Sequence, residues 1–166
     1  MTQNSSMADV LRYCDEFPLD KFKPGDVLIP EGPATNRMYI LAAGEVEVLR
    51  GETQVAAIAS PGAIFGEIAA LLGGDHTATV RAVSNVTAFR IENAKTLLHE
   101  HREIGFHVSV ILARRLTDAT GYLADLKRQF ADRTDHLGMV DKVLDTLVQR
   151  QQDKISVGPS TQDSRL

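Results

Sequence analysis

A glycine and a carboxylate stand inside an apolar run near the middle of the chain. Residues 64–72 read Ile-Phe-Gly-Glu-Ile-Ala-Ala-Leu-Leu, and Gly66 and Glu67 are the exceptions in it. Gly66 lets the backbone approach a guest closely and leaves its N–H available as a donor. The carboxylate of Glu67 is costly in apolar surroundings unless a partner hydrogen-bonds to it. The pair therefore indicates either a polar ligand or a buried polar network that the fold needs.

A second polar stretch follows within a few residues. After the turn Gly-Gly-Asp at 73–75, residues 76–80 read His-Thr-Ala-Thr-Val, which is typical of a short strand. Thr77 and the backbone amides around it could cradle an anion. This stretch therefore indicates a candidate anion-binding position close in sequence to Glu67.

These two stretches must be positioned by an all-β framework. From residue 22 to residue 91, turn signals containing Gly, Pro or Asn recur at short intervals. Between them lie β-leaning runs, which predict strands at 27–29, 38–41, 46–49, 79–83 and 86–91. The run at 64–72 is the exception, because its Ala and Leu content predicts a short helix inserted between strands.

The two polar stretches resemble the phosphate-binding cassette of cyclic-nucleotide-binding domains, the family of the catabolite activator protein and the kinase regulatory subunits. Its usual form is Phe-Gly-Glu, a small apolar run, a turn, then Arg-Ser/Thr-Ala-Thr-Val. Residues 65–67 and 77–80 fit this form, whereas the place of the arginine, nine residues after the glutamate, holds His76. Further landmarks at 22–28, 31–32 and 38–48 follow in the family's order. The resemblance covers about residues 20 to 130. It implies an α+β fold, an antiparallel β-roll of the double-stranded β-helix (jelly-roll) type followed by a long C-terminal dimerisation helix.

The period changes after Ile91. Apolar side chains recur in steps of four and three, which is the pattern of a two-stranded coiled-coil seam: Leu112, Leu116, Ala119, Leu123, Leu126 and Phe130. The seam predicts a helix from about 106 to 130 and a parallel homodimer, with packing back onto the roll as the alternative.

Four segments are expected along the chain. Residues 1–20 form an N-terminal segment with one short helical piece at 8–13, and 21–130 form the roll with its long helix. Residues 131–150 are expected to add a C-terminal helix and 151–166 to be a disordered tail, since the tail is polar with little apolar content. Because 131–166 are too few for a helix-turn-helix domain, DNA binding by this chain alone is not expected.

The resemblance also implies a ligand-binding site and assigns a role to each of its residues. Glu67 accepts from a ribose 2′-hydroxyl, Gly66 offers its amide, Thr77 binds the cyclic phosphate, and Ala78 allows close approach. On the long helix, Ala119 replaces a threonine that bonds the adenine, and Thr120 matches a serine that reaches the base from the partner subunit. The candidate ligand-binding residues are Phe65, Gly66, Glu67, Ile68, His76, Thr77, Ala78, Ala119 and Thr120.

His76 is the departure that matters most, because an arginine there would be permanently charged and give two parallel bonds to phosphate. A histidine with an ordinary pKa of about 6.5 is mostly neutral at pH 7. Losing one charged partner costs about 10- to 150-fold in affinity. We therefore expect weak cyclic nucleotide binding that strengthens toward pH 6, with a solvated turn histidine as the alternative for His76.

Composition excludes several other classes. The net charge is -4, which disfavours non-specific nucleic acid binding, and the single Cys14 fits a reducing compartment. Since no export or membrane segment is visible, a cytoplasmic location without membrane contact is expected. No enzyme, metal or cofactor is expected, because four of the five histidines fall in the helical half without metal-ligand spacing: His99, His101, His107 and His136.

Two functions stay open. The first is a regulatory module that senses a cyclic nucleotide, cAMP or cGMP, and signals through a hinge and dimer helix. The second is a degenerate roll without ligand that acts as a dimerising protein-interaction module. Residues 65–67 and 77–78 favour the first, and His76 and Ala119 favour the second.

Overall fold

The computed structural model describes residues 7–129, 142–143 and 145–146. The chain divides into two compact units, Met1–Ile111 and Leu112–Leu166. Every strand and the short helices belong to the first unit, whereas residues 112–129 of the last helix belong to the second. None of the helices in these described residues is long and apolar enough to cross a membrane.

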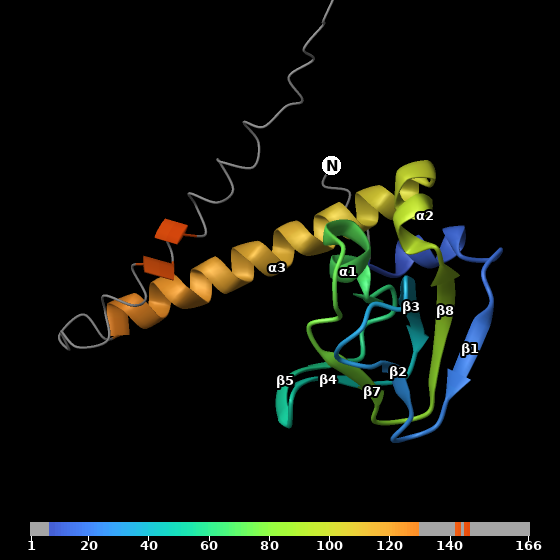
Figure 1. The fold of residues 1–166 in the computed structure, drawn as a ribbon, viewed down its shortest axis with the longest axis horizontal. Helices are drawn as coiled ribbons and strands as arrows, with labels where there is room; N and C mark the ends of the chain where they lie inside the picture. Colours follow the sequence, from blue (N-terminus) through green and yellow to red (C-terminus); the bar gives the residue numbers. More distant parts are fainter. Residues whose placement is uncertain (1–6, 130–141, 144, 147–166) are drawn as a thin grey trace, which may run out of the picture. The chain divides into compact units, whose positions relative to one another are not determined.

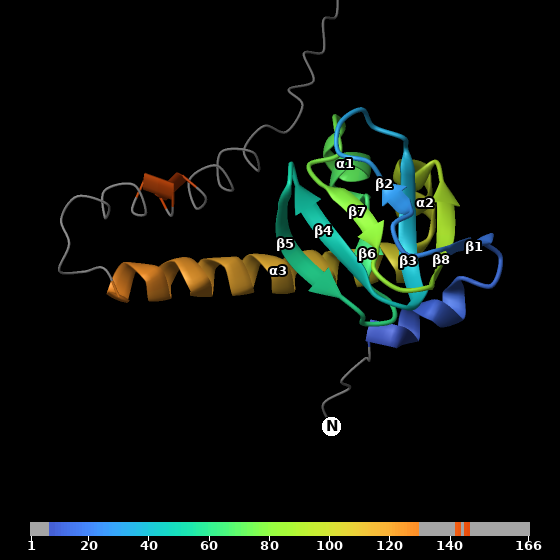
Figure 2. The same cartoon turned by 90° about the horizontal axis from the view of Figure 1, so that it is seen from below.

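The first unit is a roll of two four-stranded antiparallel sheets (Figures 1 and 2). The first sheet has the order β1 (Leu19–Phe22), β8 (Val86–Glu92), β3 (Arg37–Ala43) and β6 (Ile64–Phe65). The second has the order β2 (Val27–Ile29), β7 (Thr79–Ala82), β4 (Val46–Arg50) and β5 (Thr53–Ile58). Followed by a long helix, this roll confirms the α+β fold predicted from the sequence.

Side chains that alternate along the strands fill the space between the two sheets. On β3, Tyr39 and Leu41 point into this inner core, where Val46 of β4 and Val80 of β7 meet them. The other face of β3 carries Met38 and Ile40, both fully buried. Strand β3 is therefore buried on both faces.

Helices accompany the first sheet. The 3₁₀ helix η1 (Met7–Tyr13) contacts β3, and the helices α2 (Ala94–Glu100) and α3 (Arg102–Gln129) follow β8 in the sequence (Figure 1). In its first part α3 buries Ile104, Val108 and Ile111. The ring of His107 lies 3.0 Å from the carbonyl oxygen of Gly62, measured from Nε2. The start of α3 is thus held against the roll.

The sequence predicted five of the eight strands and missed β1, β5 and β6. These three are short or largely exposed, so their own residues carry little apolar alternation. The helix predicted at 64–72 is shorter, because β6 occupies its first two residues and α1 (Glu67–Leu72) begins only after Gly66. The long helix begins at Arg102, earlier than predicted, and α2 was not anticipated.

Two expected segments lie wholly or largely outside the described residues. Of the helix expected at 131–150, only 142–143 and 145–146 are described, and these are helical. The tail expected at 151–166 lies entirely outside them. The expected helical piece at 8–13 is present as η1.

Candidate ligand-binding site

Gly66 joins β6 to α1 in a conformation that favours glycine. Its φ is 88° and its ψ is -2°, in the left-handed region. A Cβ atom at this position would lie 2.5 Å from the carbonyl oxygen of Arg37 and 2.9 Å from Cδ1 of Ile29. Gly66 therefore combines a positive φ with a close approach to β3. The close approach of its backbone to a guest, which the sequence predicted, stays a prediction.

Glu67 follows directly and is buried, with only 2% of its surface exposed. It is the first residue of α1, where the N-terminal end of a helix favours a negative charge. Its neighbours differ from it. Phe65 is part of the inner core, whereas Ile68 is 38% exposed. The four consecutive candidates thus comprise one core residue, one left-handed glycine, one buried carboxylate and one surface residue.

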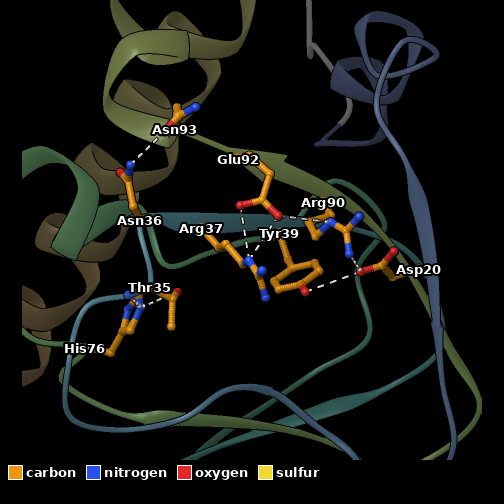
Figure 3. A network of polar contacts seen from close by, with 9 residues as sticks. All are labelled: Asp20, Thr35, Asn36, Arg37, Tyr39, His76, Arg90, Glu92 and Asn93. Atoms are coloured by element: carbon orange, nitrogen blue, oxygen red, sulfur yellow. Dashed lines mark hydrogen bonds and ion pairs between the residues drawn. The ribbon is translucent and has the colours of Figure 1, made fainter.

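His76 is buried, so the alternative of a solvated turn histidine is wrong. Only 5% of its surface is exposed. Its backbone pairs with Gly32 through two hydrogen bonds, with N···O distances of 3.0 and 2.7 Å. The Nε2 atom of its ring accepts from the backbone N–H of Thr35 at 3.1 Å and lies 3.0 Å from the Thr35 hydroxyl (Figure 3). His76 is an integral part of the roll.

These contacts keep the His76 ring neutral. Burial lowers the pKa of His76 below its usual value, and the nearby Asp75 opposes this shift only in part. Because Nε2 accepts a hydrogen bond from an amide, the ring proton belongs on Nδ1. A protonated ring would lose this bond. The structure therefore argues against the expectation that His76 supplies positive charge near pH 6.

Thr77 and Ala78 come next and are more accessible than His76, Thr77 being exposed and Ala78 half-buried. The carbonyl oxygen of Thr77, which lies just before β7, accepts from Nε of Arg50 at the end of β4, at 3.2 Å. Neither Arg50 nor Thr35 was among the site residues predicted from the sequence. The strand predicted at 46–49 placed Arg50 at the end of a strand. It did not indicate which segment Arg50 would face.

Two of the candidates belong to the second unit. The hydroxyl of Thr120 donates to the carbonyl oxygen of Leu116 in its own helix, at 2.7 Å, and Ala119 is exposed. Because residues 112–129 form a unit of their own, a contact of Ala119 or Thr120 with a base remains a prediction.

A cavity of about 190 Å³ lies beside the candidate site. It is lined by His76, by Asn36 and Arg37 at the start of β3, by residues of α1 and the turn after it, and by Lys95 of α2. Glu67, Thr77 and Ala78 do not line it. Of the candidate ligand-binding residues, the cavity therefore shares only His76.

Both arginines of the first sheet pair with carboxylates in one network (Figure 3). Nε of Arg37 pairs with Glu92 at 3.0 Å, and Nη1 of Arg90 pairs with Asp20 at 3.2 Å. The hydroxyl of Tyr39 also points to Asp20, at a weak 3.4 Å. Nε of Arg90 lies 3.3 Å from Glu92 but in poor hydrogen-bond geometry, so we regard Asp20 as its principal partner. Arg37 and Arg90 are thus already committed within the fold.

The roll matches a known protein family. Residues 19–97 match the model of the "Cyclic nucleotide-binding domain". The "CRP-like cAMP-activated global transcriptional regulator" of Mycobacterium tuberculosis is 30% identical over 139 residues, which are 80% of this chain and 59% of that protein. The "cAMP-dependent protein kinase regulatory subunit" of Hypocrea atroviridis is 40% identical over 75 residues, 45% of this chain and 16% of that protein. The chain thus spans less than two thirds of either relative.

Solved structures share the fold. The Thermus thermophilus Catabolite Activator Protein superposes with a TM-score of 0.59 at 18% identity, covering 95% of this chain and 89% of that one. A structure described as "Sp-2Cl-cAMPS bound to PKAR CBD2" gives a TM-score of 0.52 at 21% identity, covering 66% and 71%. Fold and family match agree with the cassette at 65–67 and 77–80. Residues 19–97 therefore form a cyclic nucleotide-binding domain, with CRP-like regulators and protein kinase A regulatory subunits among its homologues.

Proposed function

We propose that this chain is a regulatory module that binds a cyclic nucleotide, cAMP or cGMP, and signals through a hinge and a dimer helix. The observation that carries the proposal is the buried carboxylate of Glu67 directly after the left-handed Gly66. A carboxylate has several acceptor positions, and a ribose hydroxyl is a donor that can use one of them. The family match gives the pair this particular meaning.

The remaining parts of the site fit the same ligand. Thr77 is exposed and carries a hydroxyl that suits a phosphate, and the small Ala78 beside it leaves room for close approach. The module needs no catalytic step, metal or cofactor. Among the residues that the structure describes, no cluster of His, Cys, Asp and Glu could hold a metal ion.

The proposal includes a parallel homodimer through α3. On this helix Leu116 is 40% exposed, and Leu112, Leu123 and Leu126 are only half-buried within a single chain. A row of leucines spaced by four and three is stabilised by a second copy of the same helix. A cytoplasmic location and the absence of DNA binding by this chain alone belong to the same proposal, supported by its single cysteine and net charge of -4.

Calorimetric titration of the unmodified chain with cAMP and with cGMP tests the proposal, with 5′-AMP as the control nucleotide. We expect one of the cyclic nucleotides to bind and 5′-AMP to bind much more weakly. The variant Glu67→Gln should weaken binding, because it removes the charge that accepts from the ribose. Absence of binding by both cyclic nucleotides would refute the proposed function.

One observation favours the second function, a degenerate roll that serves only as a dimerising interaction module. The His76 ring, at the position of the family arginine, is already bonded to Thr35 inside the fold. If neither the unmodified chain nor His76→Arg binds a cyclic nucleotide while the chain remains a dimer, this second function replaces the first.

A further inference from the structure

A guanidinium from a neighbouring strand lies beside the cassette. Arg50 is the last residue of β4, and its Nε donates to the carbonyl oxygen of Thr77 at 3.2 Å. The register of β4 against β7 pairs Leu49 with Thr79. Because the strands are antiparallel, Arg50 extends past the start of β7 toward the residues that precede it. The fold thus brings a permanent positive charge to the residue next to His76.

Most donors of this guanidinium remain available. An arginine carries five N–H donors, and Nε–H of Arg50 uses one of them on Thr77. Within the described part of the chain, no carboxylate forms an ion pair with Arg50. The carboxylate of Glu31 reaches the residue that follows Arg50, where its Oε2 accepts from the backbone N–H of Gly51 at 2.8 Å.

The other arginines of the strands differ in this respect. Arg81 lies on β7, the strand that follows Thr77 and Ala78, but its Nη2 is 2.8 Å from the carboxylate of Glu47. Arg37 and Arg90 are paired with Glu92 and Asp20. Among the four arginines on the described strands, Arg50 is the one that contacts the cassette and forms no ion pair with a carboxylate.

We propose that Arg50 supplies the phosphate-binding charge that His76 does not. Its Nη groups donate to an anionic oxygen of the cyclic phosphate held at Thr77, while its Nε stays on the Thr77 carbonyl. A guanidinium can hold two neighbouring acceptors at once, which suits this position. The inference rests on the proposed function and names a residue of its site.

One consequence separates Arg50 from His76 as the source of charge. A guanidinium stays protonated throughout the physiological range, whereas a histidine does not. Cyclic nucleotide affinity should therefore be nearly constant between pH 6 and pH 8. If His76 supplied the charge, affinity would rise as the pH fell, because binding would take up a proton.

Titration of Arg50→Gln and Arg81→Gln with cAMP and cGMP tests the inference. Arg50→Gln should weaken binding of the cyclic nucleotide that the unmodified chain prefers by about 10- to 150-fold, the cost of a charged hydrogen-bonding partner. Arg81→Gln removes the same charge from the same pair of strands, and it should leave the affinity unchanged. Thermal melting of each variant checks that the roll is intact.

A rescue variant distinguishes a charge on the phosphate from a merely structural bond to Thr77. Adding His76→Arg to Arg50→Gln should restore most of the lost affinity, because it returns a guanidinium to the cassette. Equal affinity of Arg50→Gln and the unmodified chain would overturn the role of Arg50 and leave the proposed function standing. Failure of the unmodified chain to bind either cyclic nucleotide would overturn both. A loss in Arg50→Gln that His76→Arg does not restore would assign Arg50 a structural role and also overturn the inference.

Discussion

The substitution Gly66→Ala separates backbone strain from steric contact in the cassette. A left-handed residue other than glycine costs about 1–2 kcal/mol. At Gly66, where φ is 88°, the added methyl group would also press on the Arg37 carbonyl at 2.5 Å and on Ile29 at 2.9 Å. Inserting a methyl group into a packed site costs about 1–3 kcal/mol. Gly66→Ala should therefore lower the free energy of unfolding by about 2–5 kcal/mol.

Gly25→Ala is the matched control. The φ of Gly25 is 92°, close to that of Gly66, but nothing lies within 4 Å of a Cβ atom placed there. Only the backbone cost of about 1–2 kcal/mol should remain. Each kcal/mol lowers the melting temperature by roughly 2–4 °C for a chain of this size. Urea denaturation and thermal melting of both variants measure the difference. Equal losses in the two variants would refute the claim that the Arg37 carbonyl makes glycine necessary at position 66.

Three further outcomes follow from burial and charge. Stability to urea should fall as the pH drops below about 6.5, because burial lowers the pKa of His76 and the unfolded chain then binds more protons. His76→Gln should reduce this slope, whereas a change at the exposed His99 should not, and equal slopes would contradict the assignment. Leu123→Glu should convert a dimer to a monomer in sedimentation at tens of micromolar, while Thr117→Glu, off the leucine row, should not; a monomeric unmodified chain would refute the dimer. Burial raises the pKa of Cys14 to about 11, so this thiol should react with Ellman's reagent at pH 8 only after unfolding, and fast labelling of the native chain would show that it is accessible.

The local sequence was enough to predict most strands of the roll. Turn residues bound the five predicted strands, and their apolar content is high enough to mark them without knowledge of their partners. The cassette could also be located, because the combination of Gly66 and Glu67 in an apolar run is unusual by itself. The prediction failed at β5, whose residues Thr53–Ile58 are mostly exposed and are ordered by pairing with β4. An edge strand of this kind has no alternation for the sequence to reveal.

The details of the site depended on contacts between distant residues. Thr35 and His76 are 41 positions apart, and their hydrogen bond makes His76 a buried neutral side chain. Arg50 and Thr77 are 27 positions apart, and only the register of β4 against β7 brings them together. Sequence spacing could identify which residue was missing from the cassette, since that comparison needs only local order. Strand pairing decided which positive charge lies close to the cassette in place of the missing arginine. The sequence could not show this, because side chains on a sheet have their neighbours on adjacent strands and not along the chain.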